Sequence, residues 1–312
     1  MEKLPECSIL EYNPNQVDIV RKTFHYEDIQ KLHQDLDNFE DWIKKQNHFE
    51  VSKFDRDYLE RFLIASKGSV EIAKKRFDKL CTLRTLMPEF LRNFDVKDEF
   101  SRVTGWDYFC ILPKPTKDNY RVLATTIHNP DVPEIDFLEL YRFIISQIEY
   151  LFKYDYNAGF EVICDTRMYT FNIISKINPI TLKKCTTIFL EAFGFRLKCL
   201  HIISGSKFFN MILSIIKSAL TDKLVKRIIV HDNVESLKTY ISKDILPVDF
   251  GGTERCMKVL CEANLEEMRK EDHVARLKFL GTAGTDESRR LCQTFNEEYL
   301  GMPGSFKSLC VD

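Results

Sequence analysis

Short runs of β-forming residues alternate with long helical stretches between residues 121 and 230, and this alternation restricts the folds that the chain can adopt. The runs cover residues 121–127, 160–165, 200–203 and 228–230. The first is followed by Asn129-Pro130, a pair that favours a turn. Strands that alternate with helices are typical of α/β layer folds, in which helices cover the sheet. The sequence therefore predicts an α/β domain with a largely covered sheet.

The first 95 residues show a different pattern, because their apolar side chains recur at spacings of three and four. Residues 29–43, 58–63 and 72–83 each carry such a stripe, which is typical of amphipathic helices. Ser69 is placed to cap the third helix, and Pro88 lies where that helix must stop. Residues 1–95 are therefore predicted to form a small helical domain.

The overall charge and the absence of export signals limit the possible partners. A formal charge of −2 argues against a surface that tracks nucleic acid. The N-terminal segment lacks a secretory pattern, and the longest apolar stretch, 208–220, is shorter than the roughly 20 residues that span a bilayer. None of the ten cysteines forms a C-x-x-C pair. We expect a cytoplasmic protein with reduced thiols, mostly packed in the core, and no nucleic-acid partner.

Catalytic spacings are missing from the sequence. The seven histidines are scattered, and there is neither a glycine-rich phosphate loop nor a nucleophile elbow. An enzyme acting on a hydrophobic substrate would most readily use Asp165 or His201, although a helix cap and a buried core histidine are the simpler interpretations. We expect no catalytic residues, no metal and no cofactor.

Positive charge is concentrated beside the most apolar part of the chain. Residues 196–227 contain seven Lys or Arg and one acid, Asp222, whereas residues 131–161 contain seven acids and two bases. A basic rim beside an apolar helix favours binding to an anionic membrane. The helices predicted at 138–152 and 208–220 are apolar around much of their circumference, so they either form central core or enclose a ligand cavity.

Several motifs in order resemble the CRAL-TRIO family of lipid-transfer proteins. The resemblance covers residues 30–255 and includes the segments 57–63, 73–77, 195–203 and 245–252, of which the last reads Ile245-Leu246-Pro247-Val248-Asp249-Phe250-Gly251-Gly252. It implies a helical N-terminal domain at 1–95 and an α/β lipid-binding domain at 96–255. That domain should have a mixed, largely parallel sheet and a helical lid. Residues 256–312 are a C-terminal extension that the resemblance does not cover.

The resemblance is greatest to the branch of α-tocopherol transfer protein and cellular retinaldehyde-binding protein, and it implies two sets of site residues. A basic cleft for phosphoinositide head groups falls on Arg196, Lys198, Lys223 and Arg227. The hydrophobic pocket, including the inner stripe of the lid, falls on Tyr141, Ile144, Ile148, Phe160, Cys164, Ile188, Phe189, Phe193, Phe195, Leu200, Ile212, Ile216 and Leu220.

Three departures from the family pattern concern these sites. Ser66 stands where the family supplies a further cleft arginine, with Lys67 beside it. The lid, 204–220, opens with Ser204-Gly205-Ser206 instead of Asn-x-Pro, and Asp165-Thr166-Arg167-Met168 replaces Asp-x-Glu-Gly. The cleft, the lid motion and the choice of ligand are therefore expected to differ from those of the family.

Together these features favour a monomeric carrier that is not an enzyme. It would hold one hydrophobic molecule such as a tocopherol, retinoid or other isoprenoid, and would exchange it at phosphoinositide-containing membranes. The alternatives are a phosphoinositide-sensing trafficking adaptor without transferred cargo, and an enzyme acting on a hydrophobic substrate.

Overall fold

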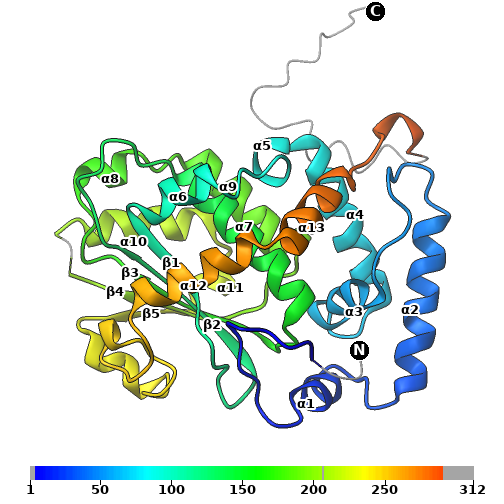
Figure 1. Ribbon diagram of the computed structural model, residues 1–312, viewed down its shortest axis with the longest axis horizontal. Helices are drawn as coiled ribbons and strands as arrows, with labels where there is room; N and C mark the ends of the chain where they lie inside the picture. The colour runs from blue at the N-terminus through cyan, green and yellow to red at the C-terminus, as the bar shows by residue number, and fades with distance from the viewer. Residues whose placement is uncertain (1–3, 206, 291–312) are drawn as a thin grey trace, which may run out of the picture.

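The predicted strands pair within one five-stranded sheet in the computed structural model, which describes residues 4–205 and 207–290 (Figure 1). The strands follow one another across the sheet in chain order. They are β1 Asp107–Ile111, β2 Tyr120–Ile127, β3 Gly159–Asp165, β4 Leu197–Ile203 and β5 Ile228–His231. β1 is antiparallel to β2, and the remaining pairs are parallel. The predicted α/β fold with a mixed, largely parallel sheet is confirmed.

The helices of residues 16–86 lie to one side of the sheet, in blue to cyan in Figure 1, whereas the helix at residues 98–104 lies beside the first strand. Ser69 caps the third predicted helix as expected, since its Oγ accepts a hydrogen bond from Ile72 N at 3.3 Å. That helix ends at Leu86, two residues before Pro88. The elements are α1 Gln16–Thr23, α2 Ile29–Lys44, α3 Arg56–Ala65, α4 Val70–Leu86, α5 Pro88–Leu91 and α6 Asp98–Thr104.

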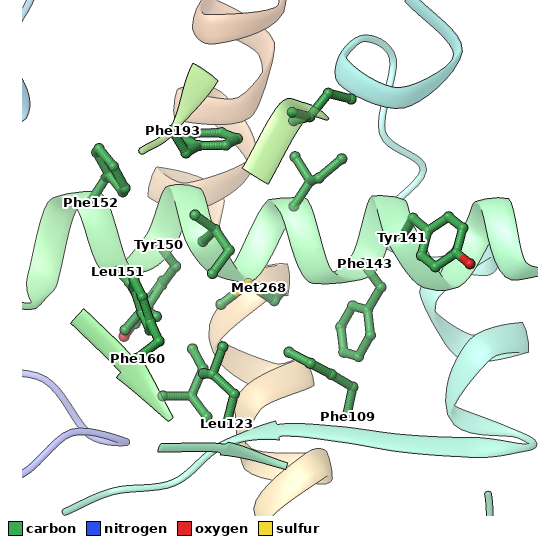
Figure 2. Close-up of a cluster of buried hydrophobic side chains, with 14 of the residues drawn as sticks. Phe109, Leu123, Tyr141, Phe143, Tyr150, Leu151, Phe152, Phe160, Phe193 and Met268 are labelled. Atoms are coloured by element: carbon green, nitrogen blue, oxygen red, sulfur yellow. The ribbon is translucent and has the colours of Figure 1, made fainter. Parts of the chain in front are cut away.

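Helix α7, Phe137–Tyr154, runs through the centre of the molecule, and 13 of its 18 residues are buried. Figure 2 shows Phe109 and Leu123 of the sheet on one side of this helix and Phe193 on the other. Contact on both sides explains why the helix is apolar around most of its circumference. Most of α7 is therefore central core.

Short helices complete the α/β domain and connect its strands. Residues 188–192 continue α9 as one π-helical turn, and α10 and α11 fill the connection from β4 to β5. The elements are α8 Phe171–Ser175, α9 Pro179–Thr187, η1 Ile188–Ala192, α10 Phe209–Ala219, α11 Asp222–Val225, η2 Val234–Thr239 and η3 Val248–Phe250.

The C-terminal extension joins the two parts of the molecule. Helix α12, Met257–Arg269, packs on the edge strand β1, where Asn264 Oδ1 accepts a hydrogen bond from Ile111 N at 2.8 Å. Helix α13, Glu271–Thr282, and η4, Glu287–Arg289, follow, and Arg290 pairs with Asp78 of α4 at 2.8 Å. Residues 291–312 of the predicted extension lie outside the described residues, as does Ser206 of the lid.

Buried ion pairs join the N-terminal helices to the α/β domain and brace its sheet. Arg84 of α4 donates to Glu149 Oε1 of α7 at 2.9 Å. Arg121 of β2 makes a two-pronged contact with Asp155, with Nε to Oδ2 at 2.8 Å and Nη2 to Oδ1 at 2.9 Å. Burial raises the pKa of Asp155, but Arg121 and the other donors outweigh it and hold this pKa below its ordinary value.

Most of the described thiols are buried, as the sequence predicts. The eight described cysteines are free, and five of them are buried. Burial raises the pKa of Cys185 well above its ordinary value, so this thiol is packed as a small apolar side chain. Cys292 and Cys310 lie outside the described residues.

Candidate ligand cavity and basic cleft

An apolar cavity of about 220 Å³ lies between the sheet and the helices that cover it. Thr186 supplies the single hydroxyl group in a lining that is otherwise apolar. Strands β1 to β4 provide one wall, while α7, α9, η1 and α10 provide the other. The lining consists of Phe109, Leu123, Ile144, Val162, Leu182, Thr186, Phe189, Leu190, Phe195, Leu197, Leu200, Ile216, Ala219 and Leu220.

Helix α10 closes this cavity in the position that the family resemblance assigns to the lid. Ile216 and Ala219 face the cavity, whereas Met211 on the outer side is 42% exposed. Thr186 Oγ1 of α9 lies 2.8 Å from the carbonyl oxygen of Lys183 in its own helix and 3.2 Å from that of Ala219 at the end of α10. An apolar inner face together with an apolar outer face accounts for the excess of hydrophobic residues in this segment.

The structure divides the predicted pocket residues into two groups. Ile144, Phe189, Phe195, Leu200, Ile216 and Leu220 line the cavity. The others lie outside its lining: Tyr141, Ile148, Phe160, Cys164, Ile188, Phe193 and Ile212. Of these, Phe160 stacks on Phe195 with ring centroids 4.0 Å apart, and Ile148, Ile188 and Phe193 are fully buried in the core. Which of them contact a ligand remains a prediction.

Several lining residues were not predicted from the sequence. Phe109 was missed because β1 was not recognised as a strand, and Leu123 and Val162 lie on strands that were recognised. The alternation of side chains along the strands could have identified Val162. It pairs with Leu200, so both side chains point to the same face of the sheet.

All four predicted phosphoinositide-binding residues meet in one open cleft of about 520 Å³. Arg196 directly precedes β4 and Lys198 is the second residue of that strand, whereas Lys223 and Arg227 come from the connection between α10 and β5. Two further cations, Lys67 and Arg76, reach the same cleft from the N-terminal helices. Among the described residues the lining contains no acid: Lys67, Arg76, Tyr120, Leu190, Gly194, Phe195, Arg196, Leu197, Lys198, Thr221, Lys223, Leu224 and Arg227.

The cations of the cleft are crowded and poorly compensated. Burial lowers the pKa of Arg196, and Arg227 lowers it further, while Tyr120 acts in the opposite direction. The guanidinium lies 4.1 Å from the ring centroid of Phe24, and its buried Nη1 has no hydrogen-bond partner among the described residues. Because like charges disfavour one another and a buried donor needs an acceptor, the cleft favours a bound anion.

Residues 105–252 match the model of the CRAL/TRIO domain, and residues 28–100 match that of the Pinta-like UBA domain. Residues 105–252 therefore form a CRAL/TRIO domain. Clavesin-1 of Xenopus laevis is 28% identical over 71% of this chain and 68% of its own length. The alpha-tocopherol transfer protein-like protein of Mus musculus is 24% identical over 70% of this chain and 64% of its own. The crystal structure of Sfh5 aligns with 78% of this chain and 97% of its own, with 13% identity and a TM-score of 0.47.

These matches confirm the predicted resemblance to the CRAL-TRIO family and the general prediction of a lipid-binding protein. Within the described residues, no helix combines the length and apolar character needed to cross a bilayer. The same residues contain no group of three or more His, Cys, Asp or Glu that could hold a metal ion.

The two residues considered for catalysis are engaged elsewhere in the CRAL/TRIO domain. Asp165 accepts hydrogen bonds from Thr126 Oγ1 at 3.0 Å and from Arg167 Nε at 2.9 Å. His201 lies on the face of β4 opposite to Leu200, where its Nδ1 is 3.0 Å from Nε2 of His231 and its Nε2 is 3.3 Å from Glu161. Neither residue lines the cavity.

The buried histidine pair predicts a loss of stability in acid. Burial lowers the pKa of His231 to about 4, with His201 as the next cause, whereas nearby Asp232 raises it. Because this pKa is below the roughly 6.5 of an unfolded histidine, the contribution to stability is complete above that pH and falls between about pH 6.5 and 4. Denaturant unfolding across this range should show a steeper decline for the natural chain than for His231→Gln. Parallel declines would contradict a buried neutral His231.

Proposed function

We propose that the protein is a cytoplasmic lipid carrier that holds one hydrophobic molecule in the apolar cavity and docks on phosphoinositide-containing membranes through the basic cleft. The observation that carries this proposal is that the cavity and the cleft share a wall. Leu190, Phe195 and Leu197 line both of them. A lipid whose phosphorylated head group occupies the cleft therefore lies next to the apolar cavity. Cargo would enter and leave that cavity.

The composition of the cavity favours a ring-bearing or isoprenoid ligand. Its lining includes the rings of Phe109, Phe189 and Phe195, and the Thr186 hydroxyl lies against backbone carbonyl groups, so the surface of the cavity is apolar. Burial of apolar surface contributes about 25 cal/mol per Å², so a ligand that buries several hundred Å² gains several kcal/mol of gross binding free energy. A tocopherol, a retinoid or a related molecule fits this chemistry better than a phospholipid with two chains.

The size of the cavity implies that α10 moves when the ligand enters. The cavity encloses about 220 Å³, whereas pockets for drug-sized ligands usually enclose about 300–1,000 Å³. The end of the helix lies against Thr186 of α9, and its outer residue Met211 is exposed to an approaching membrane. Contact of the outer face with lipid would favour an outward displacement of the helix and enlarge the cavity.

Transfer between vesicles tests the complete proposal. Donor vesicles carry a fluorescent tocopherol or retinoid, and acceptor vesicles consist of phosphatidylcholine with or without phosphatidylinositol bisphosphate. We expect the protein to accelerate transfer, and to do so more strongly when the acceptor contains the phosphoinositide. Recruitment to phosphoinositide vesicles without any transfer would instead favour the trafficking adaptor.

A further inference from the structure

We propose that Arg76, on α4 of the N-terminal helical region, is a phosphate-binding residue of the basic cleft and takes the place of the arginine that is absent at Ser66. The inference rests on the proposed membrane docking and extends it to a residue outside the four predicted ones. Arg76 lines the cleft together with Arg196, Lys198, Lys223 and Arg227.

The guanidinium of Arg76 lies where a side chain longer than serine at residue 66 would extend. Its Nη1 donates to the carbonyl oxygen of Ala65 at 2.5 Å and lies 3.3 Å from Ser66 Oγ, at the end of α3. Ser66 itself is buried, so it cannot reach into the open cleft. A small residue at 66 therefore leaves room for an arginine that enters from the neighbouring helix.

The backbone of Gly194 packs directly against this guanidinium. It has a φ of +66°, and a Cβ at this residue would lie 2.5, 2.7 and 2.9 Å from Nη1, Cζ and Nε of Arg76. Only glycine allows the plane of the guanidinium to lie so close to the backbone. Gly194 also lines the cleft, two residues before Arg196. The arginine of the N-terminal region is thus held against the segment that carries a predicted head-group ligand.

The electrostatic surroundings of Arg76 call for an anion from outside the chain. No carboxylate among the described residues pairs with it, and burial followed by the charge of Arg196 lowers its pKa. The guanidinium groups of Arg76 and Arg196 line the same cleft. Together they can donate paired hydrogen bonds to the oxygens of a phosphate monoester. A bound phosphoinositide would accordingly contact the N-terminal helical region and the α/β domain at the same time.

Binding to vesicles of phosphatidylcholine with phosphatidylinositol bisphosphate tests this assignment. Arg76→Gln is expected to weaken binding by about tenfold to a hundredfold, as for the loss of a charged hydrogen-bonding partner. Lys75→Gln should leave binding unchanged. It makes an equal change of charge on the same helix, but Lys75 is exposed and does not line the cleft. Arg76→Lys should fall between them, because a lysine keeps the charge but not the planar pair of donors.

Two further measurements distinguish phosphate binding by Arg76 from a structural role. Ser66→Arg in the Arg76→Gln background should restore much of the binding, which a merely structural role of Arg76 would not allow. A soluble inositol bisphosphate should show the same loss with Arg76→Gln, which identifies the phosphates as the ligand and not the bilayer.

The outcomes separate this inference from the proposed docking. If the natural chain fails to bind the vesicles, membrane docking by the cleft is wrong and the inference falls with it. If the natural chain binds and folded Arg76→Gln binds equally well, only the assignment of Arg76 is overturned. An equal loss for Arg76→Gln and Lys75→Gln, or a loss on vesicles but not with the soluble head group, would overturn it as well.

Discussion

Replacing Arg121 by alanine is expected to lower the free energy of unfolding by about 3–5 kcal/mol, which would be among the largest effects of a single substitution in this protein. The side chains of Arg121 and Asp155 are both fully buried. Removal of the arginine leaves a carboxylate in the core without its two-pronged partner. The Arg121 side chain also donates to the backbone carbonyl groups of Leu112, at 3.3 Å, of Pro113, and of Glu11, at 3.1 Å, so three carbonyl groups lose a donor too.

Equilibrium unfolding in urea measures this effect, and the chain offers a matched control. Lys44→Ala removes a lysine from a pair with Asp41 in which both side chains are more than half exposed, so its effect should stay below about 1 kcal/mol. The double substitution Arg121→Met with Asp155→Leu should recover much of the lost stability, because no unpaired charge remains buried. Equal and small effects of Arg121→Ala and Lys44→Ala would contradict the structural role of the buried pair.

Reversing the charge of Lys198 and Lys223 together is expected to abolish docking on phosphoinositide vesicles and to leave cargo binding intact. Both residues are exposed and line the cleft, so their substitution should not disturb the core. A lysine near an anionic surface contributes about 1 kcal/mol, and a glutamate adds repulsion of similar size. The pair of reversals should therefore weaken binding by about 4 kcal/mol, or on the order of a thousandfold.

Vesicle sedimentation provides the measurement for this second prediction. Lys44→Glu with Lys45→Glu changes the net charge by the same amount at two exposed residues at the end of α2, away from the cleft, and should bind almost normally. A loss of similar size in both double variants would show that net charge, and not the cleft, governs docking. Increasing salt should weaken the natural chain more than the Lys198 and Lys223 variant, since fewer charges remain to be screened.

Strands β2 to β5 could be predicted from the sequence because their runs of β-branched residues are clear, whereas β1 could not. That strand begins with Asp107, a carboxylate that is almost fully buried, and an acid is an unexpected start for a core strand. Burial raises the pKa of Asp107 to about 8, although Thr125 hydrogen-bonds to it and lowers the value. The partner that makes this acid tolerable lies on the adjacent strand, so tertiary structure was needed to identify it.

The lining of the cavity was only partly predictable for a reason of local geometry. Residues 188–192 form a π-helical turn, which changes the direction of successive side chains relative to a regular α-helix. As a result Phe189 and Leu190 face the cavity, whereas Ile188 and Phe193 are buried in the core. Arg76 was not predicted as a cleft residue because it enters the cleft from the N-terminal helical region. Sequence spacing does not show which residues of that region lie next to the α/β domain.

Native mass spectrometry of bound small molecules tests the central claim most directly. The purified protein is incubated with vesicles that carry tocopherols, retinoids, carotenoids, sterols and phospholipids, and is then separated from them. We predict a one-to-one adduct with a single hydrophobic class. Leu200→Trp, which places a larger side chain in the cavity wall, should lose this adduct, and the Lys198 and Lys223 reversal should keep it when the ligand is supplied without membranes. A folded natural chain without any adduct, or an adduct unchanged by Leu200→Trp, would contradict carriage in this cavity.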